Sequence, residues 1–411
     1  MRFPSKKIKA QSLSVVITIA LCIGLLLGGM LVLATFYSKA KDQFSIERRL
    51  IQNWKSALNY CLVQKEIPHK FTLDLFDQKE DSVYFQSIPF GILNYARIST
   101  FHGTDSVTKT CLLGSKNNIR DKLSLYLANS NKALGVCGKT LINGDVKIPE
   151  RGIERTYIEG QNFVGRQLYN GTKFKSTNSV PQLGAEILSN INLCYESNGG
   201  IPFPEDADSI ISKDNLVHFS SNDVLLIDQF IRGIVIIESR QKVIVSNQAN
   251  LLNIIIKAPV IEFESNFKGS LQAFATDSII TGYDCTFNYP TYFVLKPNQT
   301  PIFSPKIDVG KDNIIQGNLI SLQERFNLKN NSIVTVNQNS IVNGTVYSQG
   351  YTQLKNCKIE GDLYTQKLYL KTPSSVYENQ LLNVTIDKTK LDSNHLDIGL
   401  INQERTWIRL D

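Results

Sequence analysis

The sequence predicts a mainly β protein with a single N-terminal transmembrane helix. This helix continues as an amphipathic helix and leads into a β-rich ectodomain, either a β-helix (solenoid) or a β-sandwich. Three observations support this fold class: an uncharged apolar run near the N-terminus, short strand-like runs after residue 80, and a repeated apolar-x-Gly-x-apolar frame.

Composition indicates an ordered chain with little attraction for nucleic acid. Of its 411 residues, 42% are hydrophobic and 20% are charged, which is enough apolar surface for a core. The net charge is +7, and four positive charges fall within residues 1–12. The remaining sequence is a mixture of both signs near +3, so no nucleic-acid partner is expected.

Residues 13–37 contain no charged side chain. A helix of this length crosses the ~30 Å hydrocarbon core of a bilayer. A cleaved signal peptide has a shorter apolar region and a small-residue cleavage site, whereas Ser38-Lys39-Ala40 fits such a site poorly. We therefore expect an uncleaved signal-anchor, with the lipid bilayer as the partner of residues 13–37.

Charge around this run predicts its orientation. Residues 1–12 form a basic leader that we expect in the cytoplasm, and everything from about Ser38 is expected outside. The predicted location is the bacterial inner membrane, with a periplasmic or extracytoplasmic ectodomain.

An amphipathic helix is predicted over residues 38–65, ending near Val63. Its apolar residues recur every three or four positions among charged ones, and they are Phe44, Ile51, Trp54, Leu58, Cys61 and Leu62.

This basic leader, apolar helix and amphipathic extension resemble the N-terminal architecture of type IV pilins and pseudopilins. The resemblance covers about the first 65 residues. The chain departs from the family where its leader ends in Lys9-Ala10 rather than glycine, and where Ser14-Val15-Val16 lacks the family's glutamate. The resemblance implies a minor pilin-like subunit of a secretion or fibre machine.

Three regions are predicted beyond the helix. Residues 80–183 form a first β-rich part, residues 184–222 an irregular insert, and residues 223–411 a β-helix-like repeat region.

The clearest repeat lies near the C-terminus. Residues 340–347, SIVNGTVY, match residues 357–364, CKIEGDLY, after a shift of 17. In a solenoid, stacked coils place alternate apolar residues inward. The inward set is predicted to be Val342, Val346, Ile359 and Leu363, and the outward, substitution-tolerant set to be Asn343, Thr345, Glu360 and Asp362.

Further copies of the frame occur along the chain. They start at Ile142, Ile231, Phe267 and Ile315, with half a copy at Ile158. A glycine in the frame permits a bend or a close backbone approach. A β-sandwich also has short strands separated by turns, so it remains the alternative.

These coils resemble those of bactofilins and related polymer-forming β-helical proteins, mainly over residues 315–386. The resemblance implies a scaffold that associates with itself, end to end or side by side. The chain departs from the family in its long inserts, around residues 100–135 and 184–222.

No known catalytic or metal-binding motif is present in the sequence. The four histidines are isolated and form no H-E-x-x-H frame, and the seven cysteines form no C-x-x-C pair. We therefore predict no catalytic, cofactor-binding or metal residues, no cofactor and no enzymatic activity. Isolated, buried thiols are expected for the cysteines.

One stretch combines basic and aromatic residues and is a candidate interaction patch. It comprises Arg151, Arg155, Tyr157, Phe163, Arg166 and Tyr169. Guanidinium groups and aromatic faces favour contact with an anionic glycan or a partner protein. Alternatively, the aromatic residues pack into the sheet and the arginines pair with Glu150, Glu154 and Glu159.

These observations predict a non-enzymatic envelope protein whose solenoid-like ectodomain has a structural, assembly or interaction role. Its expected partners are envelope proteins or further copies of itself. Two alternatives remain, namely a minor pilin-like subunit and a carbohydrate-binding or carbohydrate-processing β-helix.

Overall fold

The structure is a computed structural model, and it divides into two compact units. Unit 1 comprises residues 1–87 and 96–110, and unit 2 comprises residues 88–95 and 111–410. The described residues are 11–64, 69–74, 81–116, 122–196, 199–204, 207–299, 301–324, 326, 330–392, 395–398 and 405–409. Of the predicted leader, residues 1–12, the first ten residues lie outside the described residues.

Unit 1 contains one long helix and a small sheet. Helix α1 runs without interruption over Gln11–Val63, which confirms the predicted end of the amphipathic helix. The strands follow in the sheet order β1-β2-β3-β4, and β2, β3 and β4 continue into unit 2. Their bounds are β1 Lys70–Asp74, β2 Asp81–Phe90, β3 Leu93–His102 and β4 Asp105–Lys116.

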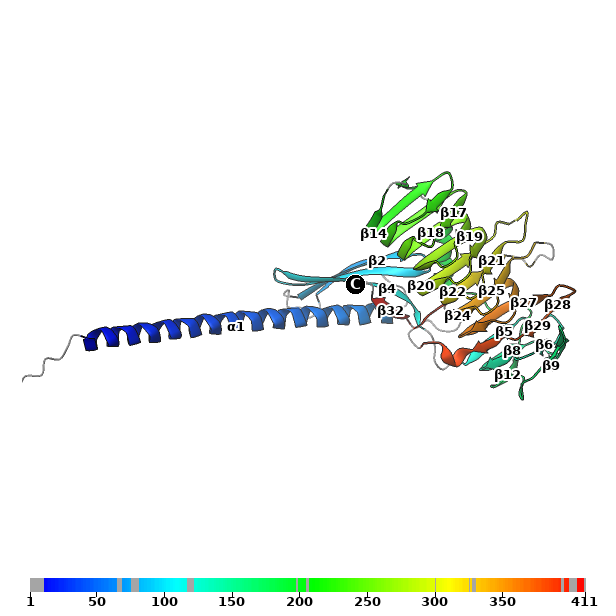
Figure 1. Ribbon diagram of the computed structural model, residues 1–411, viewed down its shortest axis with the longest axis horizontal. Coiled ribbons are helices and arrows are strands. Elements are labelled where there is room, and N and C mark those ends of the chain that lie inside the picture. The colour runs from blue at the N-terminus through cyan, green and yellow to red at the C-terminus, as the bar shows by residue number, and fades with distance from the viewer. Residues whose placement is uncertain are drawn as a thin grey trace, which may run out of the picture. The chain divides into compact units, whose positions relative to one another are not determined.

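Unit 2 is built mainly from parallel strands stacked in coils (Figure 1). Eight strands are long and turn a corner of the coil. They are β14 Ser209–Ser220, β16 Phe230–Ser239, β18 Asn250–Phe263, β19 Lys268–Thr281, β20 Thr286–Leu295, β22 Ile314–Ser321, β25 Thr345–Leu354 and β27 Asp362–Lys371.

Shorter strands complete these coils. They are β13 Ile201–Pro202, β15 Val224–Leu226, β17 Lys242–Val245, β21 Lys306–Val309, β23 Ile333–Val336, β24 Ile341–Asn343, β26 Lys358–Ile359, β29 Gln380–Leu382 and β30 Thr385–Asp387. Strand β28, Val376–Glu378, instead pairs antiparallel with the end of β27. The coils have three faces, and the first face is defined by β24, β26 and β30, with the start of β22.

The predicted register of the repeat is confirmed. Val342 pairs with Ile359, and Val346 pairs with Leu363, all in parallel strands. These four side chains are fully buried within one apolar core that runs along the inside of the coils. Parallel stacking of consecutive coils is the signature of a β-helix and excludes the antiparallel pairing of a β-sandwich.

The earlier β-rich part of the sequence stacks beneath the later one. Strand β5 pairs with β27, and β7 pairs with β30, so residues 123–175 extend the coils after residue 387 (Figure 1). The strands of this segment are β5 Leu123–Leu127, β6 Leu134–Cys137, β7 Leu141–Asn143, β8 Asp145–Ile148, β9 Ile153–Arg155, β10 Tyr157–Ile158, β11 Gln161–Asn162 and β12 Lys173–Lys175.

Asparagine and aspartate form one corner of the coils. In successive coils, a residue with positive φ precedes the inward residue of the first face by three positions. Short polar side chains tolerate this left-handed conformation best after glycine. The residues are Asn266, Asp284, Asp312, Asn339, Asn356 and Asn383.

The frame glycines lie at the next corner, where neighbouring coils touch. A Cβ atom on Gly361 would lie 2.1 Å from the carbonyl oxygen of Gly344, and a Cβ on Gly344 would lie 2.1 Å from that of Gly317. Such distances leave no room for a side chain, so close backbone approach explains these glycines.

Two predicted copies of the frame do not follow this register. Gly269 pairs with Phe287 and thus takes an inward position rather than a corner. Ile158 belongs to the antiparallel pair β10–β11, so the half copy beginning there is not a coil. A five-residue frame is short enough to match by chance.

A second apolar core covers the outside of another face. Helix α2, Ala185–Tyr195, packs there with Ile187 and Ile191, against outward residues such as Tyr347 and Tyr364. The segment 184–222, predicted as irregular, therefore contains an ordered helix and strands β13 and β14.

Short C-terminal elements complete unit 2. They are the 3-10 helix η1 Lys388–Lys390 and strands β31 Leu396–Asp397 and β32 Arg405–Arg409, both of which pair with β4.

Candidate functional site

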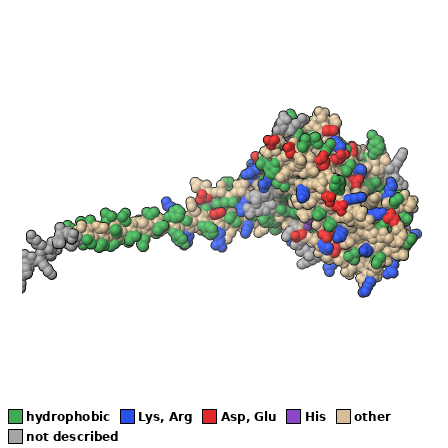
Figure 2. Space-filling view, viewed as in Figure 1, with side chains coloured by type: hydrophobic (Ala, Val, Ile, Leu, Met, Phe, Trp, Pro, Cys, Tyr) green, Lys and Arg blue, Asp and Glu red, His purple; other side chains and the backbone are tan. Residues whose placement is uncertain are grey.

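The N-terminal half of α1 presents an apolar surface. Its large hydrophobic side chains are exposed, with Leu25 69% and Leu33 68% accessible. Figure 2 shows hydrophobic side chains along this half of the helix. Phe36 and Tyr37 end the apolar run, at the position where aromatic residues contact a membrane interface. The helix is long and apolar enough to cross a membrane, so residues 13–37 form a candidate anchor.

The next part of α1 is exposed but no longer apolar. Between residues 38 and 48 only Ile46 is partly buried. The charged side chains have both signs, and they are Lys39, Lys41, Asp42, Glu47 and Arg48. Charges of both signs along a helix suit contact with a similar neighbouring helix.

The last part of α1 packs within unit 1, as the spacing of its apolar residues predicted. Leu50, Trp54, Leu58 and Cys61 are buried. The Thr100 hydroxyl of β3 donates a hydrogen bond to the carbonyl oxygen of Leu50, at 3.1 Å. This packing attaches the anchor to the sheet.

A buried carboxylate joins the helix to two strands. Asp81 of β2 is 1% exposed, and it accepts a hydrogen bond from the Arg49 Nε at 2.8 Å. The His102 Nδ1 of β3 lies 2.9 Å from the other carboxylate oxygen. Asp81 therefore fixes the contact of α1 with the sheet through charged groups.

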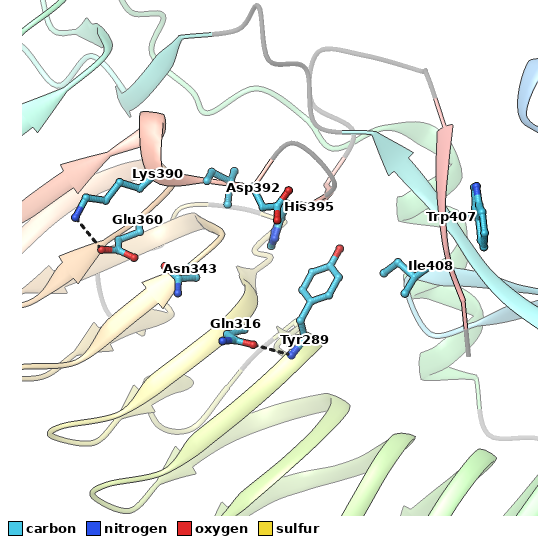
Figure 3. A pocket seen from close by; sticks show the side chains of 10 residues that line it. Tyr289, Gln316, Asn343, Glu360, Lys390, Asp392, His395, Trp407 and Ile408 are labelled. Carbon is cyan, nitrogen blue, oxygen red and sulfur yellow. Dashed lines mark hydrogen bonds and ion pairs between the residues drawn. The ribbon is translucent and has the colours of Figure 1, made fainter. Parts of the chain in front are cut away.

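In unit 2, a cleft lies beside the first face of the coils (Figure 3). Its volume is about 640 Å³, within the range of small-molecule sites. Gln316, Asn343 and Glu360 lie on its floor, one from each successive coil. Each is the middle residue (x) of the apolar-x-Gly frame. Because neighbouring side chains of a strand point to opposite faces, the residue after each inward apolar residue points outward.

The opposite side of the cleft comes from the C-terminal segment. It is formed by Lys390, Leu391, Asp392, His395, Trp407 and Ile408, with Tyr289 at one end. In Figure 3, Tyr289 and Ile408 lie next to each other, whereas Trp407 points to the other side of β32. Apolar and hydrogen-bonding groups therefore face one another across the cleft.

Two side chains of the cleft are held by neighbouring groups. Lys390 Nζ lies 3.1 Å from the Glu360 carboxylate. His395 Nε2 lies 3.0 Å from the Asn318 side-chain oxygen, which also accepts the Thr345 backbone N–H. Because that oxygen is an acceptor, His395 donates through Nε2. Burial is the main cause that lowers the pKa of His395 to about 4, so the ring is neutral near pH 7.

Asp362 and Lys388 form a buried ion pair, and each is two residues from a side chain that lines the cleft, Glu360 or Lys390. Asp362 accepts hydrogen bonds from Lys388 Nζ and from the Thr345 hydroxyl, each at 2.5 Å. Thr345 and Asp362 alternate with the inward residues as predicted, but they are 0% and 2% exposed, so the prediction that they lie at the surface and tolerate substitution is wrong. Lys388 and His395 bond Asp362 and Asn318, and so cover outward positions that directly follow the frame glycines Gly361 and Gly317.

The predicted basic-aromatic patch is partly brought together. The Arg155 guanidinium lies 5.7 Å from the centre of the Phe163 ring. Phe163 and Tyr169 pack against the apolar core, while Arg151, Arg166, Arg155 and Tyr157 are exposed. Glu150 and Glu159 form ion pairs with lysines rather than with these arginines.

The cysteines are mostly buried, as expected for thiols that act as apolar residues. Cys61, Cys111, Cys137, Cys285 and Cys357 are buried. Burial raises the pKa of the Cys61 and Cys357 thiols to about 12, so both stay protonated and poorly nucleophilic near pH 7.

Comparison with known proteins yields only weak structural similarity. No protein-family model and no curated protein matches the chain. Among solved structures, the competence-associated pilin ComZ from Thermus thermophilus aligns with 89% of this chain and 95% of its own, with 9% sequence identity and a TM-score of 0.23. A TM-score of this size does not establish a common fold.

Proposed function

We propose that this protein is a membrane-anchored, non-enzymatic envelope subunit that associates with neighbouring helices in the manner of a minor pilin, and displays a β-helix as an interaction module. The observation that carries the proposal is the division of α1 into three parts: one apolar and exposed, one charged and exposed, and one whose apolar residues are buried within unit 1.

Helix length supports association beyond simple anchoring. About 20 residues are enough to span a bilayer, whereas the 53 residues of α1 extend about 80 Å at 1.5 Å per residue. Residues 38–48 thus lie beyond the predicted span, and all except the partly buried Ile46 are exposed in the described part of the chain. They combine charges of both signs with Phe44, which is 69% exposed, and so offer a surface for other helices.

A photo-crosslinking experiment tests this proposal. A photoreactive amino acid is placed at Phe44 in the full chain, expressed in cells that assemble pilins or pseudopilins. We expect ultraviolet-dependent crosslinks to the N-terminal helices of these subunits. The matched control places it at Gln353, a partly exposed residue on the outside of β25.

The result distinguishes assembly from anchoring alone. Crosslinks from residue 44 that map to pilin-like helices, with none from residue 353, support the proposal. Recovery of uncrosslinked chain from both positions, while it remains in the membrane fraction, contradicts the pilin-like role. Release of the chain from membranes by alkaline carbonate contradicts the anchor itself.

A further inference from the structure

One exposed side of α1, beyond its apolar half, carries a row of positive charges. Lys41, Arg48 and Lys55 are exposed and lie seven residues apart, which is about 10.5 Å for each step along the helix. A seven-residue repeat drifts only about 20° per step around a straight helix, so the three side chains share one side. None of the three forms an ion pair with a residue in the described part of the chain.

The negative charges of this part of α1 lie on other sides of the helix. Between residues 38 and 63, all of which the structure describes, the acids are Asp42 and Glu47. At 3.6 residues per turn they lie about 120° and 100° from Arg48, in opposite directions. The row is therefore a line of one sign, although the helix as a whole carries both.

A shallow depression accompanies the row over residues 45–56. Its volume is about 790 Å³, and its lining includes Arg48, Lys55, Ser45, Gln52 and Ser56. The serine and glutamine side chains are exposed and uncharged. Because serine is short, a second helix can approach closely between the cations. The surface thus suits one elongated partner rather than a compact ligand.

A second copy of this chain is a poor partner for the row. Two copies anchored in one membrane with the same orientation would place their helices parallel. In register, Arg48 would face Arg48 and Lys55 would face Lys55, and like charges repel. A staggered copy could present Asp42 or Glu47 only by turning its own row away. It would then offer one acid at a time, because the two lie about 140° apart.

A lipid surface is also a poor partner for the whole row. From Lys41 to Lys55 the row extends about 21 Å along the helix, whereas the headgroup layer of one leaflet is about 5–8 Å thick. A helix that leaves the membrane near residue 37 could bring Lys41 close to this layer. Arg48 and Lys55 would lie beyond it.

We infer that the row binds an acidic helix of a different subunit, with carboxylates at a matching seven-residue spacing. This inference rests on the proposed association of α1 with neighbouring helices, and it adds the chemistry of the partner. A parallel helix with this spacing places one carboxylate beside each cation, as charged side chains do along the edges of a coiled coil.

Peptide binding tests the charge of the row without any other subunit. The full-length protein is kept in micelles of an uncharged detergent, and fluorescence anisotropy follows two labelled three-heptad helical peptides. One carries glutamate at every seventh position, and the other carries lysine there and is otherwise identical. We expect the glutamate peptide to bind at least about tenfold more tightly, and to lose at least about fivefold between about 0.05 and 0.5 M salt, because salt screens exposed charges.

Charge reversal locates the site. Arg48→Glu should weaken binding of the glutamate peptide about fivefold or more, and Arg48→Glu/Lys55→Glu should favour the lysine peptide instead. Lys39→Glu is the matched control, because it makes the same change of charge on the opposite side of the helix, about 180° from Arg48. It should leave both affinities unchanged. All variants should keep the wild-type melting temperature, since these residues are exposed.

Crosslinking from residue 44 identifies the natural partner. Phe44 flanks the row, about 40° from Arg48 around the helix. We expect the crosslinked helix to come from another subunit and to carry acids at the seven-residue spacing. Arg48→Glu should reduce these crosslinks at least about fivefold, and Lys39→Glu should leave them unchanged.

Four outcomes overturn the inference. These are equal affinity for the two peptides, equal losses in Lys39→Glu and Arg48→Glu, crosslinks that join residue 44 to a second copy of this chain, and loss of peptide binding in nanodiscs that contain phosphatidylglycerol. The last result would assign the row to anionic lipid. Crosslinks to a second copy would leave helix association intact, whereas a complete lack of crosslinks contradicts the proposed function and leaves the peptide result to decide the inference by itself.

Discussion

The buried pair of Asp362 and Lys388 gives the sharpest prediction for stability. Lys388→Met removes the ammonium group and keeps most of the aliphatic stem. The Asp362 carboxylate is then left in a site where its side chain is 3% exposed, with the Thr345 hydroxyl at 2.5 Å as the side-chain donor that remains among the described residues. Breaking one half of a buried pair typically costs about 3–5 kcal/mol. We expect a loss of this size in the free energy of unfolding of unit 2.

A neighbouring lysine provides the matched control. Lys390 pairs with Glu360 at 3.1 Å, but its side chain is 53% exposed. Exposed pairs contribute about 0–1 kcal/mol, so Lys390→Met should change stability little. Replacing both members of the buried pair, Asp362→Leu/Lys388→Met, should recover most of the loss because no isolated charge remains.

Urea unfolding of the full-length protein in detergent measures these differences. The chain has two tryptophans, Trp54 in unit 1 and Trp407 in unit 2. In a Trp54→Phe background, fluorescence therefore reports on unit 2. Equal losses for Lys388→Met and Lys390→Met would refute the reasoning, since they would show that burial of the pair does not determine its energy.

Two further predictions concern pH and backbone packing. Burial holds the pKa of His395 at about 4, against 6.5 for an unperturbed ring, so the unfolded chain binds more protons between these values. The free energy of unfolding should fall by roughly 1.4 kcal/mol for each pH unit lowered through this window. Thermal unfolding of the His395→Asn variant should show no such pH dependence. An identical pH dependence in the variant would exclude His395 as its source. Gly361→Ala places a Cβ 2.1 Å from the Gly344 oxygen and should cost more than about 3 kcal/mol. Gly103→Ala has no neighbour within 4 Å and should cost about 1 kcal/mol through its φ of +56° alone; similar urea midpoints for the two variants would contradict the close approach of the coils.

Local patterns predicted the parts of the fold that depend on neighbouring residues. The spacing of Trp54, Leu58 and Cys61 gave the buried side of α1 and its end near Val63. The match of 340–347 with 357–364 gave the pairing of Val346 with Leu363, because consecutive coils stack directly.

Contacts between distant segments were not predictable in the same way. Asp362 reads as an outward residue until Lys388 is placed beside it. The cleft was missed although its floor was visible in the sequence, as the polar residue between each inward residue and its glycine. One sequence pattern could have predicted a corner of the coils, namely an Asn or Asp three positions before the inward residue, as in Asn356 before Ile359.

The stacking of residues 123–175 beneath the last coils has a consequence for synthesis. During vectorial synthesis, β5 emerges long before β27, the strand on which it pairs. Coils from β14 to β27 can add one upon another as they emerge, whereas the earlier segment waits with unpaired strand edges. Contacts this distant in sequence slow folding, and unpaired edges are prone to aggregation. A chain arrested before residue 362 would therefore lack the template for its own first coils, which makes this protein dependent on completing translation, or on a chaperone that protects residues 123–175 until then.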